Sequence, residues 1–216
     1  MARTRAQDYD AKRDAILHKS AELFALYGYS ATSITTIAEA CGSSKALLYH
    51  YYKDKEEVLF DLLFRHLQDL VLAIEAVNVS EPVDRLHRLA EALLEAYRDA
   101  DAEHQVQITS LKQLAPKRQQ VLLALERKLV EIFSDTIAEA IPEVGHGPLL
   151  KPMTMSLFGM LNWQYLWFRE GRGLTRAQYA RLATDLLIAG SPTAAKAIAG
   201  SSSSSEKMRP RKVKKS

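Results

Sequence analysis

Apolar residues recur every three or four positions along most of the chain, which is the period of an amphipathic helix. The first such stretch begins near Tyr9 and ends at Tyr27-Gly28, where glycine can adopt the left-handed conformation that ends a helix. No segment of four or more residues alternates apolar and polar positions, as a half-buried strand would. The pattern therefore predicts an all-α protein.

Two short helices joined by a turn follow the first helix. Ser33 or Thr35 is placed to cap the first of them, and Ser43 or Ser44 the second, because hydroxyl side chains accept hydrogen bonds from the free N–H groups of a first turn. Gly42 lies between them and allows a sharp turn. The arrangement predicts a helix-turn-helix unit.

Longer helices are expected in the rest of the chain. Asp54 followed by Glu57 forms a capping box for a helix that continues to about Val77, and Pro82 can open the next one. Further helices are expected over about 103–114, then up to Ile141 with Val121, Leu125, Leu129, Ile132, Phe133 and Ile137 on the inner side, over about 149–169, and from Thr175 onward. These segments predict a helical body larger than the N-terminal head.

The segment 149–169 differs from the others because it has almost no polar face. Its apolar residues are Leu157, Phe158, Met160, Leu161, Trp163, Tyr165, Leu166, Trp167 and Phe168. A helix that is apolar nearly all round must be covered on more than one side, either by deep burial in one body or by a second copy of the chain.

Composition agrees with a globular protein, since 47% of the 216 residues are hydrophobic and 25% are charged. The apolar runs are too short to span a membrane, and the charged N-terminus does not resemble a secretion signal. Cys41 is the single cysteine, so an intrachain disulfide cannot form. This cysteine usage suggests the cytoplasm.

The net charge of +3 is unevenly distributed. Residues 201–216 carry six Lys and Arg against one Glu, residues 1–55 carry eight against six acidic residues, and the remainder is acidic. Basic ends on an acidic body suit a protein that meets a polyanion through its termini, although a basic tail that merely increases solubility explains the charge equally well.

The second short helix has the properties of a DNA-reading helix. Its N-terminal N–H groups can bind phosphate, and the outward Lys45, Tyr49 and His50 can reach a duplex. Hydroxyls precede the unit and Lys53 and Lys55 follow it, so phosphate-binding groups flank it on both sides. The alternative is a helical hairpin with an aromatic packing edge. Arg3 and Arg5 could also enter a minor groove.

Residues 10–60 resemble the N-terminal domain of the TetR family of one-component transcriptional regulators. The matching pieces are the Phe24–Gly28 end of the first helix, Thr35-Ile37-Ala38, Gly42 and the closing "LYHYYKDKEEV". The resemblance implies core positions for Leu47, Leu48 and Tyr52. Together with the outward positions of the unit, it implies DNA contacts by Ser33, Thr35, Ser44, Lys45, Ala46, Tyr49, His50, Tyr51 and Lys55.

For the body, the resemblance implies a homodimer through the last two helices and a cavity for a small effector. The stretch "LFGMLNWQYLWFREGRGLT" resembles a subgroup that responds to acyl-CoA thioesters. The expected ligand-binding residues are Tyr97, Leu111, Lys112, Phe158, Asn162, Trp163, Trp167 and Arg169, with Lys112 or Arg169 meeting the CoA phosphates; core or dimer packing is the alternative for each of them.

The sequence thus predicts a helix-turn-helix DNA-binding domain over 1–53, an effector-binding and dimerisation domain over 54–192, and a disordered basic tail over 193–216. The predicted function is a repressor that binds a palindromic DNA operator and is released by an effector, with no cofactor and no metal.

Alternatives are a regulator of a non-CoA aromatic or hydrophobic compound, such as an efflux substrate, and a ligand-independent, nonspecific DNA-binding protein. An enzyme is disfavoured because the six His residues have no metal-ligand spacing and no Gly-rich phosphate loop appears.

Overall fold

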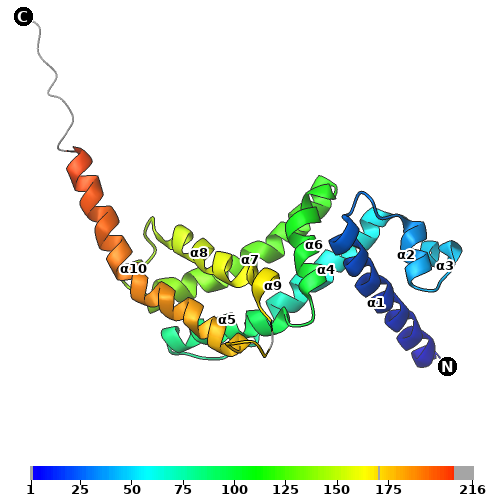
Figure 1. Ribbon diagram of the computed structural model, residues 1–216, viewed down its shortest axis with the longest axis horizontal. Helices are drawn as coiled ribbons and strands as arrows, with labels where there is room; N and C mark the ends of the chain where they lie inside the picture. Colours follow the sequence, from blue (N-terminus) through cyan, green and yellow to red (C-terminus); the bar gives the residue numbers. More distant parts are fainter. Residues whose placement is uncertain (1, 170, 207–216) are drawn as a thin grey trace, which may run out of the picture. The chain divides into compact units, whose positions relative to one another are not determined.

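The computed structural model describes residues 2–169 and 171–206, with side chains over 7–169 and 171–198. Every regular element in these ranges is a helix, which confirms the all-α prediction (Figure 1). The elements are α1 (Ala2–Tyr27), α2 (Ile34–Ala40), α3 (Lys45–Tyr51), α4 (Lys55–Glu75), α5 (Pro82–Ala96), α6 (Asp101–Ser110), the 3₁₀ helix η1 (Leu111–Gln113), α7 (Pro116–Ala140), α8 (Leu150–Asn162), α9 (Gln164–Trp167) and α10 (Arg176–Glu206).

The chain divides into two compact units, and each is described separately. The first comprises residues 1–76 and 95–129, and the second comprises residues 77–94 and 130–216. The predicted head, residues 1–53, lies within the first unit. The units divide the chain differently from the predicted boundary at residue 53, because α1 packs against both α4 and α6.

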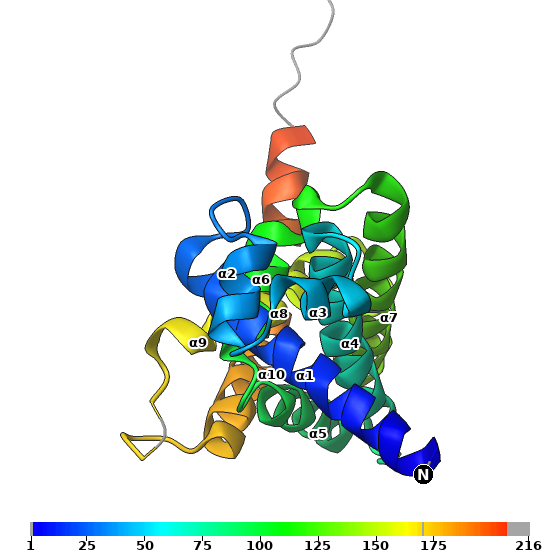
Figure 2. The same ribbon diagram turned by 90° about the vertical axis from the view of Figure 1, so that its right-hand side faces the viewer.

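In the first unit, α1 buries one face formed by Ile16, Leu17, Ala21 and Phe24. The helix begins at Ala2, before the predicted start near Tyr9, and is followed by Gly28 with a φ of 83°, as the sequence indicated. Figure 2 shows α2 and α3 side by side next to α1, in agreement with the contacts between these helices.

Helix caps resolve the alternatives that the sequence left open. Ser33 caps α2 by accepting from the N–H of Thr36, and Ser44 caps α3 by accepting from the N–H of Leu47. Asp54 accepts from the N–H of Glu57 at 2.8 Å, as predicted for α4. The returning bond of the Glu57 carboxylate comes from the N–H of Lys53. Since these bonds join residues three or four apart, local sequence defines where the short helices begin.

In the second unit, α5 buries Leu86, Leu89, Ala90 and Leu93, and α8 packs against α10. The single helix predicted over 149–169 is interrupted: α8 ends at Asn162 and α9 begins at Gln164. Gln164 is buried within this apolar stretch, and its side-chain Oε1 accepts from the Arg176 guanidinium at 3.1 Å. This contact with α10 was not foreseeable from helical period.

Two other predictions need correction. On α7 the inner face includes the fully buried Leu122, whereas Val121 is 43% exposed, so the predicted stripe is displaced by one residue at its start. The tail predicted to be disordered from residue 193 instead continues α10 as far as Glu206. Pro192 lies inside α10, where it removes one backbone donor and its ring crowds the carbonyl one turn earlier. The Ala-rich residues after it favour a helix. Residues 207–216, which carry the basic charge of the tail, lie outside the described residues.

No helix in the described part of the chain is long and apolar enough to cross a membrane.

Candidate DNA-binding surface and effector pockets

The helix α3 presents most of its surface to solvent. Leu48 is its one buried residue among the seven of the helix, and Lys45, Ala46, Tyr49 and His50 are exposed together with the cap residue Ser44. Leu47, which the resemblance placed in the core, is 39% exposed. The correction has a geometric reason, because a seven-residue helix packed on one side can bury only one narrow stripe.

The consecutive aromatic residues have three different environments. Tyr49 is 48% exposed, with the Lys45 ammonium 5.8 Å from the centre of its ring. Tyr51 stacks on Tyr9 of α1 with ring centres 4.6 Å apart, and it is half-buried. Tyr52 is buried, as the resemblance implied. Tyr49 is therefore the most accessible of these three tyrosine rings to a partner.

Tyr52 belongs to a polar network that joins three helices. Its hydroxyl donates to the Asp61 carboxylate of α4 at 2.6 Å. The Arg13 guanidinium of α1 binds the same carboxylate through two bonds, of 2.9 and 2.7 Å. Burial, followed by the bond to Asp61, raises the pKa of Tyr52. The network ties the residue that ends α3 to both α1 and α4, so the exposed face of α3 has a fixed support.

Lys55 was predicted to contact DNA, but its ammonium group is engaged within the protein. It donates to the backbone carbonyls of Tyr29 at 2.6 Å and Thr32 at 2.8 Å, and lies 4.3 Å from the centre of the Tyr29 ring. Burial lowers the pKa of Lys55. These contacts hold the loop between α1 and α2 against the start of α4.

The remaining predicted DNA contacts lie at the start of α2. Ser33 and Thr35 are both exposed, and the Ser33 hydroxyl already accepts from the N–H of Thr36 at 3.0 Å. The side chains of Arg3 and Arg5, predicted for a minor groove, lie outside the described residues.

The predicted ligand-binding residues are divided between the two units. Tyr97, Leu111 and Lys112 belong to the first, and Phe158, Asn162, Trp163, Trp167 and Arg169 belong to the second. Tyr97 and Leu111 are buried, whereas Lys112 is exposed. Phe158 is buried against Phe133, with ring centres 5.0 Å apart, so this ring serves the core of the second unit.

Tyr97 forms a buried aromatic cluster with two histidines of the first unit. Its ring centre lies 4.2 Å from that of His104 and 6.2 Å from that of His66. Burial, with the neighbouring His104 as the second cause, lowers the pKa of His66 to about 3. Burial also raises the pKa of Tyr97. The sequence favours a solvent-facing position for His66, and its burial corrects this expectation, because the helical pattern of α4 alone does not show which residues α6 covers.

A pocket of about 250 Å³ in the second unit brings two predicted ligand residues, Trp167 and Arg169, together with residues that the sequence reasoning missed. Phe168, Arg172, Leu174 and Tyr179 complete its lining. Tyr179 meets the Trp167 ring edge-on at 4.9 Å, and the Arg176 guanidinium lies 4.9 Å from the centre of the Phe168 ring. The combination of aromatic rings with the Arg169 and Arg172 side chains suits a ligand with both flat and anionic parts.

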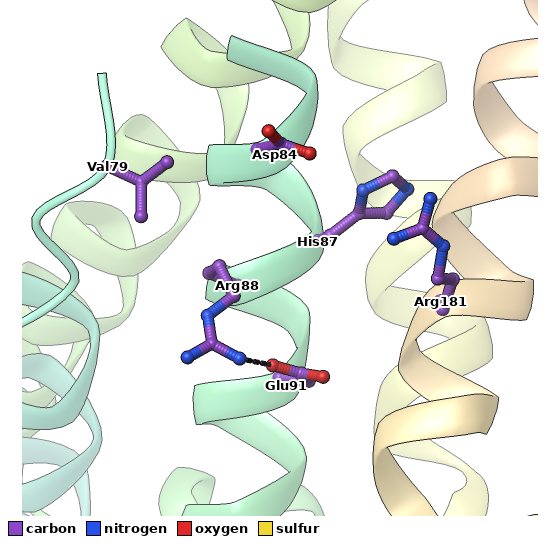
Figure 3. Close-up of a pocket in the computed structure, with 6 residues that line it drawn as sticks. All are labelled: Val79, Asp84, His87, Arg88, Glu91 and Arg181. Atoms are coloured by element: carbon purple, nitrogen blue, oxygen red, sulfur yellow. Dashed lines mark hydrogen bonds and ion pairs between the residues drawn. The ribbon is translucent and has the colours of Figure 1, made fainter. Parts of the chain in front are cut away.

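Figure 3 shows a larger pocket of the second unit, of about 330 Å³, between α5 and α10. Several of its charged side chains are paired within the protein: Arg88 binds Glu91 at 2.5 Å, and His87 contacts Asp185 at 2.8 Å through Nε2. None of the predicted ligand residues lines it. Within residues 2–169 and 171–206, no group of three or more His, Cys, Asp or Glu side chains is arranged to hold a metal ion.

Comparison with known proteins gives the family. Residues 16–62 match the family described as "Bacterial regulatory proteins, tetR family", and residues 79–191 match "Tetracyclin repressor-like, C-terminal domain". A solved TetR-family transcriptional regulator from Bordetella parapertussis is 34% identical, covers 82% of this chain and 93% of its own, and superposes with a TM-score of 0.78.

Two more distant proteins share the same architecture. The HTH-type transcriptional repressor KstR2 of Mycobacterium tuberculosis is 24% identical over 86% of this chain and 95% of its own length. The structure of AibR in complex with isovaleryl coenzyme A and operator DNA is 24% identical, with a TM-score of 0.70 over 82% of this chain and 98% of its own. Proteins of this family are transcriptional regulators and not enzymes. The chain belongs to the TetR family of helix-turn-helix transcriptional regulators.

Proposed function

We propose that this protein is a repressor that binds a palindromic operator as a homodimer and leaves it when a small effector binds. The observation that carries the proposal is the exposed face of α3, whose capped N-terminal end presents Ser44 and Lys45, followed by Tyr49. A helix with an accessible N-terminal end and a fixed support can enter a major groove. The support here is the network of Arg13, Tyr52 and Asp61.

Homodimer formation is supported by apolar side chains that remain exposed on the last helices. They are Met155 on α8, Trp163 between α8 and α9, Leu166 and Trp167 on α9, and Leu182 and Leu186 on α10. A patch of this kind on a soluble chain favours covering by a second copy, in a bundle made of helices from both chains. The two heads of such a dimer can read half-sites about 34–36 Å apart.

For the effector we propose an acyl-CoA or aryl-CoA thioester. The pocket around Trp167 and Tyr179 offers aromatic surfaces for a flat group, and Arg169 and Arg172 offer charge for phosphates. AibR, which has the same fold, binds isovaleryl coenzyme A. Trp163 and Trp167 stay candidates for both the effector site and the dimer interface.

Effector binding would act by a population shift between a state whose heads fit the operator and one whose heads do not. A coupling free energy of about 1–3 kcal/mol corresponds to a change in operator affinity of about 5–150-fold. A regulator of a different hydrophobic compound would share the DNA-binding surface and would fail to respond to thioesters.

The decisive experiment has two stages. Selection of duplexes from a random pool with the full-length protein is expected to enrich palindromes with half-sites about 10–10.5 base pairs apart. An unenriched pool would instead support a nonspecific DNA-binding protein. The selected operator is then titrated by fluorescence anisotropy in the presence of short and long acyl-CoAs, aryl-CoAs, free CoA and the free acids.

We expect at least one thioester to weaken operator binding, while free CoA and free acids do not. Arg169→Ala and Arg172→Ala should reduce that response without changing operator affinity in the absence of thioester. Arg127→Ala, at an exposed arginine of α7, is the matched control and should respond like the original protein. An operator that stays bound at saturating concentrations of every thioester rejects the CoA proposal while leaving the DNA-binding proposal intact.

A further inference from the structure

A second, separate pocket of about 200 Å³ lies in the first unit, between α1, α4 and the start of α6. Three carboxylates line it, those of Asp14, Asp69 and Glu103, together with His18, Arg65 and His66. None of the residues predicted to bind DNA or the proposed CoA effector lines this pocket.

The pocket has more negative than positive charge. Its one arginine, Arg65, binds Asp14 and lies 3.7 Å from Asp61, so its charge is already shared between two carboxylates. Among the described residues, none forms an ion pair with Asp69. Partial burial raises the pKa of Asp69, and the nearby Arg65 guanidinium opposes this shift. The carboxylates of Asp69 and Glu103 therefore remain in excess, with only the largely exposed His18 ring at 3.5 Å from Glu103.

Two buried polar atoms of the lining have no hydrogen-bond partner within the described part of the protein. One is Oε2 of Glu103, and the other is Nε2 of His66, whose residue is 6% exposed. Leaving a buried polar atom unpaired is unfavourable, so a ligand that donates hydrogen bonds would recover part of this free energy. A carboxylate oxygen can only accept, which requires the ligand to carry N–H or O–H donors.

The shape and composition of the pocket exclude several ligand classes. An anion would be repelled by the excess of carboxylates, and the described side chains provide no arrangement for a metal ion. Leu17 and Leu62 add apolar surface to the lining. The volume corresponds to that of about six or seven water molecules at about 30 Å³ each, which limits the ligand to a few carbon atoms between its polar ends.

We propose that this pocket binds a small organic ammonium ion, best a short alkyl diamine, as a second effector that is independent of the CoA thioester. One ammonium group would lie between Glu103 and Asp69, and the short hydrocarbon part would contact Leu17 and Leu62. The pocket walls on α1 and α4 are joined by the ion pairs of Arg65 with Asp14 and of Arg13 with Asp61. The second ammonium group of the diamine would lie at Asp14 and compete with Arg65 for this carboxylate. The contact between α1 and α4, the helices that support α3, would change, and operator affinity would change with it.

Isothermal titration of the full-length protein with 1,4-diaminobutane tests the binding step. Butylamine, which has one ammonium group, and butyrate, which has a carboxylate instead, are the comparison ligands. We expect the diamine to bind more tightly than butylamine and butyrate not to bind. Glu103→Gln and Asp69→Asn keep the side-chain shapes and remove the charges, and each should weaken diamine binding by about tenfold or more.

Asp99→Asn, at an exposed aspartate outside the pocket, is the matched control and should bind the diamine like the original protein. Circular dichroism and the thermal midpoint establish whether the Glu103→Gln variant folds. Asp69 is exposed, so we expect Asp69→Asn to fold normally and to test diamine binding even if Glu103→Gln does not fold. Anisotropy with the selected operator then measures the effect of the diamine on DNA binding.

Absence of diamine binding at millimolar concentration, or binding that is equal in the original protein and both pocket variants, would overturn the proposal. Equal binding of butyrate and the diamine would do the same. If the diamine binds and operator affinity stays unchanged, the result would support the binding site and would reject its role in controlling DNA binding. The response to CoA thioesters, measured in the same variants, should be unaffected, so failure of one proposal is distinguishable from failure of the other.

Discussion

Individual side chains around α3 differ in role although they are neighbours in sequence. Lys45 is exposed beside Tyr49, whereas Lys55 points its ammonium group at backbone carbonyls of Tyr29 and Thr32. Both lysines suit phosphate contacts by residue type and position. The structure supports this role more directly for Lys45, because the Lys55 ammonium would have to leave its carbonyl partners to reach DNA.

This difference predicts opposite behaviour for two substitutions. Lys45→Ala should weaken binding to operator and random duplex alike and reduce the slope of log affinity against log salt by about 1, while stability to urea stays unchanged. Lys55→Met should leave the salt slope unchanged and lower the free energy of unfolding by about 1–2 kcal/mol, because loop carbonyls lose their charged donor. Anisotropy at several salt concentrations and urea denaturation provide the two measurements. A reduced slope for Lys55→Met at unchanged stability would place Lys55 on DNA.

At the scale of helices, the exposed apolar residues of α8, α9 and α10 contrast with the well-buried faces of α4 and α5. Leu182 and Leu186 lie one turn apart on α10, and both are exposed, whereas Ala183 and Leu187 on the same helix are buried. An amphipathic helix has one apolar stripe; α10 has apolar residues on a second side as well. This second side is where we expect the partner chain to pack.

Leu186→Glu should therefore convert the proposed dimer to a monomer, because it places a charge in the apolar face expected to form the interface. Sedimentation velocity at micromolar concentration measures the change directly, and operator binding should fall because a palindrome needs both heads. Leu72→Glu is the matched control, since Leu72 is also an exposed leucine but lies on α4 in the first unit. A Leu186→Glu protein that sediments like the original protein would show that this face does not form the interface.

For the molecule as a whole, the buried His66 links stability to pH. Burial holds the pKa of this imidazole at about 3 in the folded protein, below the usual value of 6.5. The unfolded chain therefore binds a proton that the folded protein does not between these two pH values. The contribution of His66 to the free energy of unfolding is therefore fully present above pH 6.5 and is lost as the pH falls from 6.5 towards 3.

Lowering the pH from 6.5 to 5.0 should decrease the free energy of unfolding by up to about 2 kcal/mol through this group. Urea denaturation across this range provides the measurement. His66→Leu should flatten the pH dependence while retaining the fold, and His146→Leu, at an exposed histidine of the loop between α7 and α8, should keep the slope of the original protein. Equal slopes in all three proteins would show that His66 is not the responsible group.

Much of the local structure was predictable from sequence. The buried stripe of α1, the Asp54 cap of α4, the start of α5 at Pro82 and the glycine turn at Gly42 all follow from neighbours three or four residues apart. The resemblance over residues 10–60 also predicted the family and the exposed face of α3. The displaced stripe at Val121, the break after Asn162 and the extension of α10 to Glu206 were missed, because helical period alone does not fix where a helix meets its neighbours.

The sequence by itself thus determined the helices, most of their caps and the family, since these depend on interactions within a few residues. The tertiary structure decided which polar side chains are available. It placed the Arg13 guanidinium on Asp61, turned Lys55 towards Tyr29, and gathered Asp14, Asp69 and Glu103 around one pocket. The physical reason is that an ion pair, a buried histidine or a charged pocket is made by helices that are distant in sequence, and its free energy depends on burial, which only the packed structure defines.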